Sequence, residues 1–255
     1  MPKTYQMKDL SDSFTIKKKD IPSLPMRMVV IGRTGCGKSS LALGNFLLRP
    51  EFYLNDFKNY NIFIFSGSLK GDLKMQTIVK CLDVPSVNLF DSFDEDIAHA
   101  IYDMLVDNFN EAIEEKRKPE HSIFIFDDLG FSNLQNKNNK NSILDKIFSN
   151  GRKFLISTIT LNQRVTQLSS NAREQASVLV LFSSSNMQLE LIEKQFNYLS
   201  SKKQFMNMIK KYTGDSVHDY IIMDLGKKNI YRNMEFKAIC TCSDGTNDCG
   251  NYQKK

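Results

Sequence analysis

The sequence predicts an α/β fold, in which a mostly parallel central sheet is flanked by helices. The first observation is that short apolar runs of strand length alternate with longer segments of helical periodicity. The second is composition: the chain has 255 residues, of which 41% are hydrophobic and 11% aromatic. Such a chain can bury a large core and is not mostly disordered. The third is that the sequence shows no repeat with a period of roughly 20–50 residues, which argues against solenoid and propeller architectures.

Three strands are predicted in the first half of the chain, because each is a short apolar run that ends at glycine, serine or aspartate. They are Met28–Ile31, Asn61–Phe65 and Ser122–Phe126. Ser39–Leu48 is predicted to be a helix that stops before Pro50. Asp94–Lys116 is predicted to be a long helix, because apolar residues recur every four positions on one face. These residues are Ile97, Ile101, Leu105, Phe109 and Ile113.

The second half of the chain repeats the alternation. Strands are predicted at Phe154–Ile159 and Val178–Phe182, and a helix at Asn186–Gln195. Tyr220–Met223 and Asn229–Tyr231 are expected to form a hairpin or edge strands around Gly226. The asparagine-rich segment Asn133–Asn141 is expected to be a loop after the third strand.

Composition divides the chain into three parts. We expect an N-terminal extension at residues 1–25, one folded domain at residues 26–235, and a polar, flexible tail at residues 236–255. Met1–Phe14 is polar and does not resemble a secretory signal, and no apolar run approaches the roughly 18 residues of a membrane span. We therefore expect a soluble intracellular protein that is not secreted.

The five cysteines do not indicate a disulfide framework in a chain of this length. Cys36 and Cys81 are isolated and are expected to be reduced thiols. Cys240, Cys242 and Cys249 could contribute to a zinc site, but their C-x-C-x6-C spacing lacks the paired C-x2-C of a zinc ribbon. A loose tail is the simpler interpretation.

The formal net charge is +5, and the excess of Lys and Arg lies at the two ends of the chain. Basic ends are compatible with a polyanionic partner, and equally with an ordinary solvated surface. Charge alone does not choose between them.

A glycine-rich segment between the first strand and the first helix matches G-x-x-x-x-G-K-[ST]. Glycines allow a tight turn whose N–H groups point at phosphates, helped by the helix N-terminus. Lys38 is expected to bridge the β- and γ-phosphates, and the Ser39 hydroxyl to bind Mg²⁺. A chance glycine turn would not match the lysine, the serine and the flanking elements together. The expected nucleotide-binding residues are Gly32, Arg33, Thr34, Gly35, Cys36, Gly37, Lys38, Ser39 and Ser40.

A second motif follows the strand Ser122–Phe126, which ends in Asp127 and Asp128 in the Walker B arrangement. Asp127 is expected to hold Mg²⁺ through water, and Asp128 to orient or deprotonate the attacking water. The alternative is an acidic turn at a strand end. About ninety residues separate Lys38 from Asp127, and the strand Asn61–Phe65 intervenes. That insertion indicates the additional-strand class of P-loop ATPases, in which the catalytic acid lies beside Walker B.

The sequence favours ATP over GTP. Asp127–Gly130 also fits the D-x-x-G of GTPases, but guanine specificity needs an N-K-x-D further along the chain. The nearest string, Asn136–Asn139, lacks the aspartate and follows too soon.

Polar residues around the strand Phe154–Ile159 are further candidates. Gln163 or Asn162 could contact the γ-phosphate or its water, although an amide that caps a loop is nearly as good an interpretation. Arg152 precedes this strand, and Arg164 and Arg173 follow it. Any of the three could reach a neighbouring subunit's γ-phosphate or be an ordinary surface arginine.

Together these segments resemble the genome-packaging ATPases of large DNA viruses, the poxvirus-type branch of the FtsK–HerA superfamily. The resemblance covers roughly residues 26–225. Its most specific part is N-G-R-x-x-x-I-S-x-I-x-x-x-Q-R, from Asn150 to Arg164. The other matching segments are Val29–Ser39, Ile123–Leu129, Asn171–Arg173 and Val178–Phe182.

The resemblance implies a RecA-like ATPase core that uses ATP and Mg²⁺, forms a homo-oligomeric ring and pumps double-stranded DNA into a preformed capsid. It favours Arg152 as the arginine that acts in trans and Gln163 as the strand-end sensor. It also implies a capsid or portal-vertex partner, and a location in the host-cell cytoplasm, at the virus assembly site or in the virion. Asp128 departs from the family, because many relatives have glutamate there. The cysteine-bearing tail matches nothing in it.

Packaging requires DNA contacts without sequence preference, and these are expected at phosphates. The candidate contacts are Lys137, Lys140, Lys202, Lys203, Lys210 and Lys211. Two alternative functions stay open at this point: an FtsK–HerA-like translocase or helicase of replication or plasmid transfer, and an ATP-dependent binding switch.

Overall fold

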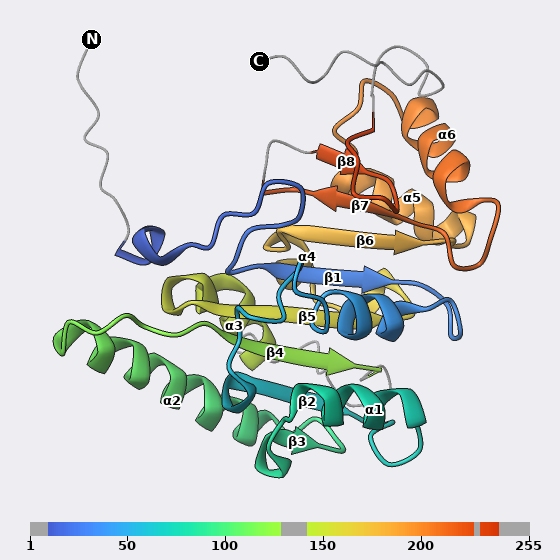
Figure 1. Cartoon of the computed structure of the whole chain (residues 1–255). Helices are drawn as coiled ribbons and strands as arrows, with labels where there is room; N and C mark the ends of the chain where they lie inside the picture. The colour runs from blue at the N-terminus through green and yellow to red at the C-terminus, as the bar shows by residue number, and fades with distance from the viewer. Residues whose placement is uncertain (1–9, 129–141, 227–229, 240–255) are drawn as a thin grey trace, which may run out of the picture.

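The fold is an eight-stranded mixed sheet flanked by helices, as the sequence predicts (Figure 1). The computed structural model describes residues 10–128, 142–226 and 230–239. The predicted loop Asn133–Asn141 and the cysteines at 240, 242 and 249 lie outside the described residues. The strands are β1 (Arg27–Ile31), β2 (Ile62–Ser66), β3 (Leu89–Phe90), β4 (Ser122–Asp127), β5 (Ile156–Asn162), β6 (Val178–Phe182), β7 (Tyr220–Asp224) and β8 (Ile230–Arg232).

The strand order is β3-β2-β4-β5-β1-β6-β7-β8. The first six strands of this order are parallel to one another, and β7 and β8 are antiparallel to their neighbours, which confirms the predicted hairpin. Ile31 pairs with Asn162, and Leu161 pairs with Asp127. The carboxyl ends of β1, β5 and β4 therefore meet at one edge of the sheet, where parallel sheets commonly bind ligands.

One expectation about the sheet needs correction. From the sequence, Asn61–Phe65 is predicted to be the extra strand of the additional-strand class. The corresponding strand β2 lies outside β4, and the strand that separates β1 from β4 is β5. Chain order does not reveal this, because a parallel sheet is built by crossovers that can skip neighbours.

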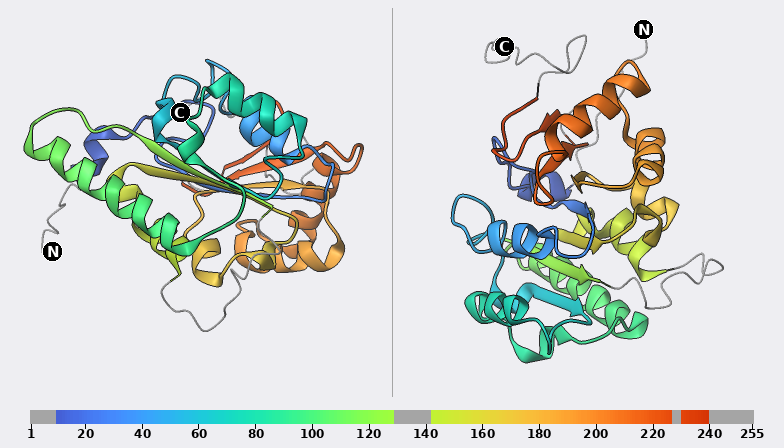
Figure 2. Two further views of the ribbon diagram at one scale, coloured as in Figure 1. Left: turned by 90° about the horizontal axis from the view of Figure 1, so that it is seen from below. Right: turned by 90° about the vertical axis from the view of Figure 1, so that its right-hand side faces the viewer.

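Helices cover both faces of the sheet, as Figure 2 shows. On one face the inward side chains of β1, β2 and β4 pack against η2 (Ser40–Asn45), a short π-type helix, and α1 (Leu73–Leu82). On the other face they pack against α2 (Glu95–Glu114), α3 (Ile143–Asn150), α4 (Ser170–Glu174), α5 (Asn186–Phe196) and α6 (Lys202–Thr213). Strands buried on both faces read as continuous apolar runs, which is why the sequence revealed them.

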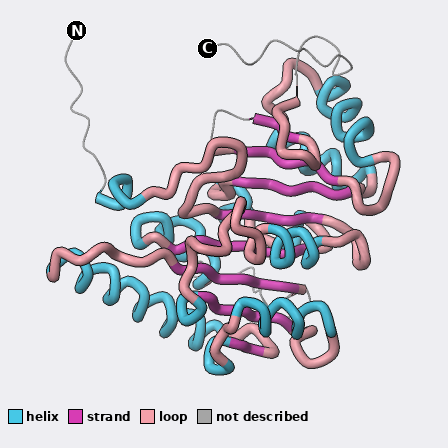
Figure 3. Tube along the Cα trace, viewed as in Figure 1, coloured by secondary structure: helices cyan, strands magenta, loops and turns pink. Residues whose placement is uncertain are grey.

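Short 3-10 turns also occur along the described chain, and Figure 3 traces its helices, strands and loops. The turns are η1 (Leu10–Phe14), η3 (Asn59–Asn61), η4 (Ser86–Asn88), η6 (Gly151–Phe154) and η7 (Val165–Gln167). None of the described helices combines the length and apolar character that a bilayer span requires.

Two predicted boundaries are wrong, each for a local reason. The helix predicted to reach Leu48 ends at Asn45, because the Phe46 carbonyl accepts a hydrogen bond from the Tyr53 amide (3.0 Å) instead of continuing the helix. The strand predicted from Phe154 begins at Ile156. The η6 turn occupies Gly151–Phe154 and is followed by Leu155, whose φ of 58° is left-handed.

The long helix α2 is present, but its buried face differs from the predicted stripe. Leu105 and Phe109 are buried as expected, whereas Ile97 is 40% exposed. A spacing of four residues drifts by about 40° per step on a helix of 3.6 residues per turn. The face against the sheet is therefore Ala98, Tyr102, Leu105, Phe109 and Ala112. Four helices and one short edge strand are not predicted from the sequence, namely α1, α3, α4, α6 and β3.

Candidate active site

The glycine-rich loop leaves β1 at the edge where the parallel strands end. The Gly32 amide donates to the Asn162 carbonyl (3.1 Å), so the start of the loop is tied to the end of β5. Gly35 and Gly37 have φ values of 79° and 102°. These left-handed conformations favour glycine, so the loop takes this shape because of its sequence.

Position 32 requires glycine for a different reason, because its neighbours leave no room for a side chain. A Cβ atom at this position would lie 2.5 Å from Cys36 Sγ and 2.8 Å from Phe182 Cβ. Cys36 is buried, and burial raises the pKa of its thiol even though Lys38 opposes that shift. The thiol therefore packs beneath the loop and is not an activated nucleophile.

Lys38 lies across the mouth of the loop. Its Nζ donates to the carbonyl oxygens of Gly32 (2.7 Å) and Arg33 (3.0 Å). Both acceptors belong to the loop itself, so phosphate oxygens can replace them without disturbing the core. The ammonium group is thus already held where a bound triphosphate would place negative charge.

Asp127 is buried at the end of β4, with 5% of its surface exposed. Its Oδ2 accepts hydrogen bonds from the hydroxyls of Ser66 (3.0 Å) and Ser68 (3.3 Å), at the end of β2. Burial raises the pKa of Asp127 and the Asp128 charge adds to this, while the two hydroxyls and Lys38 lower it. Ser66 and Ser68 are not among the site residues predicted from the sequence. Their position after the strand beside Walker B is the signal that could have assigned them.

The Asp127 site fits a magnesium ion. The hydrogen bonds described for Asp127 use Oδ2 alone, which leaves Oδ1 as a ligand. The structure gives the Ser39 side chain no capping hydrogen bond. A carboxylate and a hydroxyl oxygen are ligands that Mg²⁺ takes together with phosphate oxygens and waters. No cluster of three His, Cys, Asp or Glu side chains suited to a metal occurs among the described residues.

Asp128 and Gln163 meet across the cleft. Gln163 Nε2 donates to Asp128 Oδ1 at 3.0 Å, although 35 positions separate the two residues. Asp128 has a φ of 50°, a left-handed conformation that aspartate tolerates better than most residues. The Gln163 main chain is held in turn by the side chains of Gln167 (2.6 Å) and Gln188 (3.2 Å). The alternative sensor, Asn162, turns its amide to Thr160 Oγ1 (3.0 Å).

These groups line a single cleft of about 260 Å³. It contains most of the predicted nucleotide-binding residues together with both aspartates and Gln163, and adds Ser68, Asp72 and Lys74, which the sequence analysis missed. The lining residues are Thr34, Gly35, Gly37, Lys38, Ser39, Ser40, Ser68, Asp72, Lys74, Asp127, Asp128 and Gln163. Gly32, Arg33 and Cys36 support the loop without lining the cleft.

The three candidate arginines lie in different surroundings. Arg152 precedes β5, at the opposite edge of the sheet from the cleft, and pairs with Asp12 at 3.4 Å. Arg173 Nη1 donates to the carbonyls of Val165 (3.3 Å) and Leu168 (3.1 Å), and burial lowers its pKa. Arg173 is therefore a clamp on its own loop. The Arg164 side chain is exposed and follows β5 on the cleft side.

The lysines predicted to contact DNA also lie in different surroundings. Lys137 and Lys140 lie outside the described residues. Lys202, Lys203, Lys210 and Lys211 are all exposed on α6. Lys202 pairs with Glu190 at 3.1 Å, and Lys211 lies over the Tyr212 ring.

A contact that the sequence analysis did not foresee comes from the segment before β7. His218 Nδ1 lies 3.0 Å from the carbonyl oxygen of Cys36, in the glycine-rich loop. The antiparallel β7 begins at the edge where β1 and β6 end, since Tyr220 pairs with Phe182. This reversal brings a residue from late in the chain onto the loop.

Comparison with known proteins agrees with this geometry. The family model described as Poxvirus A32 protein matches residues 13–253. No curated protein matches the sequence.

Solved structures show the same fold. The genome packaging NTPase B204 from Sulfolobus turreted icosahedral virus 2, in complex with AMP, is 16% identical with a TM-score of 0.57, over 82% of this chain and 96% of that one. B204, the DNA-packaging ATPase from Sulfolobus turreted icosahedral virus, is 19% identical with a TM-score of 0.55, over the same shares of the two chains. These likenesses confirm the predicted P-loop ATPase fold.

Proposed function

The chain belongs to the Poxvirus A32 protein family, and on that premise we propose that it is an ATP-hydrolysing motor that moves viral double-stranded DNA into a preformed capsid. One observation carries the ATPase part. Lys38, the Asp127–Asp128 pair and Gln163 come from separate strand ends and line one cleft. The family membership supports the packaging part, and the structural similarity to B204, a protein described as a genome packaging NTPase, is consistent with it.

The residues of the cleft have separate roles in this proposal. The loop amides and Lys38 bind the phosphates, and Ser39 and Asp127 hold Mg²⁺. The metal would neutralise charge on the β- and γ-phosphates. Asp128 accepts the proton of the attacking water, and Gln163 fixes the direction of that carboxylate through the 3.0 Å hydrogen bond. Asp128 is shorter than the glutamate of many relatives, and its left-handed backbone changes the direction in which the short side chain leaves the strand.

Arg152 is proposed to act on a neighbouring subunit. It lies before β5, whereas the phosphate loop follows β1 at the other end of the parallel strands. Arg27 and Gly32 bound β1, so the two edges are about 16 Å apart at 3.3 Å per strand residue. Arg152 therefore does not serve the cleft of its own chain. In a head-to-tail ring the amino edge of one copy faces the carboxyl edge of the next, and such heterologous contacts close into rings.

DNA is proposed to bind through its phosphates without base recognition, because a packaging motor must move along every sequence of its genome. The exposed lysines of α6 are the candidate contacts within the described residues. Binding through several phosphates should weaken steeply as salt rises, since counterions are released on binding. The host-cell cytoplasm, the virus assembly site or the virion is the expected location, and a capsid or portal vertex is the expected partner.

The test is ATP hydrolysis by the full chain with and without double-stranded DNA. We expect hydrolysis that DNA stimulates and that Lys38→Ala reduces by at least about 10²-fold, because phosphate charge loses its partner. Lys58→Ala is the matched control, since Lys58 is an exposed lysine away from the cleft. ATP binding with negligible turnover would favour the ATP-dependent binding switch.

Dependence on the capsid separates packaging from the remaining alternative. Protection of DNA from nuclease in the presence of purified procapsids, ATP and the protein is the expected result. Translocation on naked DNA that procapsids do not change would favour an FtsK–HerA-like translocase or helicase.

A further inference from the structure

A second polar cavity lies at the edge of the sheet opposite the nucleotide cleft. Its volume is about 450 Å³, and it is bounded by the first residues of β1 and β6, by the last residue of β7 and by the segment that precedes β1. Three cations line it, namely Lys17, Arg27 and Arg152, together with the carboxylates of Asp12 and Asp224. The nucleotide cleft shares no residue with it.

Arg27 is the innermost of the three cations. Its Nε donates to the Gln175 carbonyl, and no other hydrogen bond or ion pair of its side chain occurs within the described chain. The two terminal NH₂ groups of a residue that lines the cavity are thus available as donors. Burial and the nearby positive charge of Arg152 both lower the pKa of Arg27, so the two guanidinium groups repel each other where no anion lies between them.

The other two cations are also weakly compensated. Arg152 pairs with Asp12 at 3.4 Å, longer than the roughly 2.7–2.9 Å of a well-formed charged hydrogen bond. Both side chains of this pair are about half exposed, and such pairs contribute little to stability. Lys17 is exposed and has no partner among the residues that the structure describes. Within the described ranges, an anion entering the cavity therefore competes with Asp12 alone for Arg152.

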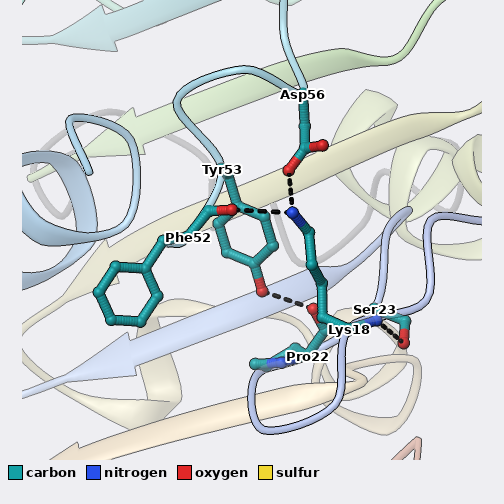
Figure 4. A network of polar contacts seen from close by, with 6 residues as sticks. All are labelled: Lys18, Pro22, Ser23, Phe52, Tyr53 and Asp56. Atoms are coloured by element: carbon teal, nitrogen blue, oxygen red, sulfur yellow. Dashed lines mark hydrogen bonds and ion pairs between the residues drawn. The ribbon is translucent and has the colours of Figure 1, made fainter. Parts of the chain in front are cut away.

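The segment that forms one wall of the cavity is fixed to the core, and Figure 4 shows the polar contacts that hold it. Residues 17–25 form one side of it, and three contacts hold them in place. Tyr53 donates its hydroxyl proton to the Pro22 carbonyl (2.5 Å), and Lys18 Nζ binds the Phe52 carbonyl (3.0 Å) and the Asp56 carboxylate (2.8 Å). Ile16 and Leu24 also pair their main chains. The three cations therefore line a cavity whose wall is fixed to the core.

We propose that this cavity is a second phosphate-binding site, in which Arg27 acts with Arg152 to bind one phosphate group through two guanidinium forks. Arginine forks match the oxygen geometry of phosphate, and charge-assisted bonds of this kind are the strong ones. The location favours the terminal phosphate of a nucleotide held by a neighbouring copy as its source. That assignment rests on the proposed ATPase ring, whereas the phosphate chemistry of the cavity does not.

The first experiment measures the cavity alone. Inorganic pyrophosphate is titrated by calorimetry into the full-length Lys38→Ala protein, in which the phosphate loop is disabled. We expect binding that Arg27→Gln weakens at least tenfold and that Asp12→Asn strengthens several-fold, because the competing carboxylate is gone. Lys58→Gln removes the same charge from a remote surface and is expected to have no effect. Pyrophosphate affinity that is equal in all four proteins would overturn the proposal.

Thermal unfolding of each variant checks that the fold is retained, because Arg27 also donates a hydrogen bond to the Gln175 carbonyl. If Arg27→Gln melts early, Lys17→Gln replaces it. Lys17 bears no structural hydrogen bond among the described residues and should still weaken pyrophosphate binding, by about threefold to tenfold. Normal binding by Lys17→Gln and unchanged binding by Asp12→Asn would then count against the site.

The second experiment identifies the source of the phosphate. Assembled Arg27→Gln protein should hydrolyse ATP at least tenfold more slowly, and mixing it with Lys38→Ala should restore part of the rate. The Lys38→Ala copies supply an intact Arg27 to neighbours with an intact loop. Absence of that rescue, or a loss of DNA affinity with normal hydrolysis, would overturn the assignment to a neighbour's nucleotide. A wild-type protein without ATPase activity would instead refute the proposed function. The pyrophosphate experiment does not depend on ATPase activity, so its result would still hold.

Discussion

Asp127 and Asp128 are adjacent in the sequence and have different surroundings. Asp127 is buried and accepts hydrogen bonds from two serine hydroxyls, so its carboxylate is fixed in position. Asp128 turns into the cleft and receives the amide of Gln163. Neighbouring carboxylates that differ in environment can take different roles. This difference supports a structural, metal-binding role for the first residue and a role toward water for the second.

Gln163→Glu tests the second role. The variant removes the amide that donates to Asp128 and places a second carboxylate about 3 Å from it, so the two like charges repel and the Asp128 carboxylate is no longer held in its direction. Because Asp128 is proposed to accept the proton of the attacking water, the rate of ATP hydrolysis near pH 7 should fall by about tenfold or more. Gln195→Glu adds the same charge at an exposed position of α5 and should leave the rate unchanged. An unchanged rate in Gln163→Glu would remove this pair from the mechanism.

His121 is a second residue whose surroundings predict a measurable effect, namely a dependence of stability on pH. Its Nε2 lies 2.9 Å from the Phe14 carbonyl, and its buried Nδ1 has no hydrogen-bond partner among the described residues. Burial lowers the pKa of His121, and the nearby Lys118 contributes, while the Phe14 carbonyl and Asp56 oppose the shift. Below about pH 6.5, His121 therefore binds a proton more readily in the unfolded chain than in the folded chain.

The free energy of unfolding should accordingly fall as the pH drops below about 6.5, by at most about 1.4 kcal/mol per pH unit until the folded pKa is reached. His121→Gln keeps a donor for Phe14 and cannot titrate, so its urea denaturation should lose this component. His99→Gln, on α2, serves as the control. Parallel pH curves for the wild type and His121→Gln would show that His121 protonates freely in the folded state.

At the scale of elements, the phosphate loop combines two different demands on glycine. Gly35 and Gly37 are needed for their left-handed backbone, and Gly32 is needed because Cys36 and Phe182 leave no room for a side chain. Gly44, in η2, meets neither demand, because a Cβ atom there would have no neighbour within 4 Å.

This contrast predicts opposite effects of the same substitution. Gly32→Ala should lower the free energy of unfolding by about 1–3 kcal/mol through overpacking. Gly44→Ala should raise it by about 0.5–1 kcal/mol, because alanine restricts the unfolded chain and favours the helix. Thermal or urea unfolding of the two variants measures both. A stable Gly32→Ala would mean that Cys36 and Phe182 can move apart, and the close packing beneath the loop would not be a constraint.

At the scale of the whole molecule, the sheet has two chemically different edges. The carboxyl edge carries the acids and the phosphate loop, and the amino edge carries Arg27 and Arg152 beside the N-terminal segment. A molecule with complementary edges is suited to head-to-tail assembly, in which each interface pairs one edge of each kind. We therefore expect hydrolysis to require assembly, although the residues that line the nucleotide cleft all belong to one chain.

Mixing variants tests this expectation for Arg152. Arg152→Ala should bind ATP normally and hydrolyse it slowly, with a loss on the order of 10³-fold or more if the arginine acts in trans. Lys38→Ala copies retain Arg152, so mixed assemblies contain some interfaces with an intact loop and an intact arginine, and part of the rate should return. Arg164→Ala, treated identically, is the comparison. A lowered melting temperature of Arg152→Ala without rescue would show that the residue only supports the turn into β5.

The local features of this fold follow from short stretches of the amino-acid sequence. Strands buried on both faces are continuous apolar runs, so β1, β2, β4 and β6 were predictable to within a residue or two. The phosphate loop was predictable because a strand, spaced glycines, lysine, serine and a helix are consecutive. The helices α1, α3, α4 and α6 were not predicted.

Contacts between residues that are distant in the sequence depend on how the strands are ordered in the sheet. Sheet order placed β5, and not β2, between β1 and β4, and thereby brought Gln163 to Asp128. The same order put Ser66 and Ser68 on Asp127 and gathered Arg27 and Arg152 around one cavity. Local patterns record the period and polarity of each segment. The order of strands depends on crossovers and on the packing of whole faces, which no short stretch of sequence contains.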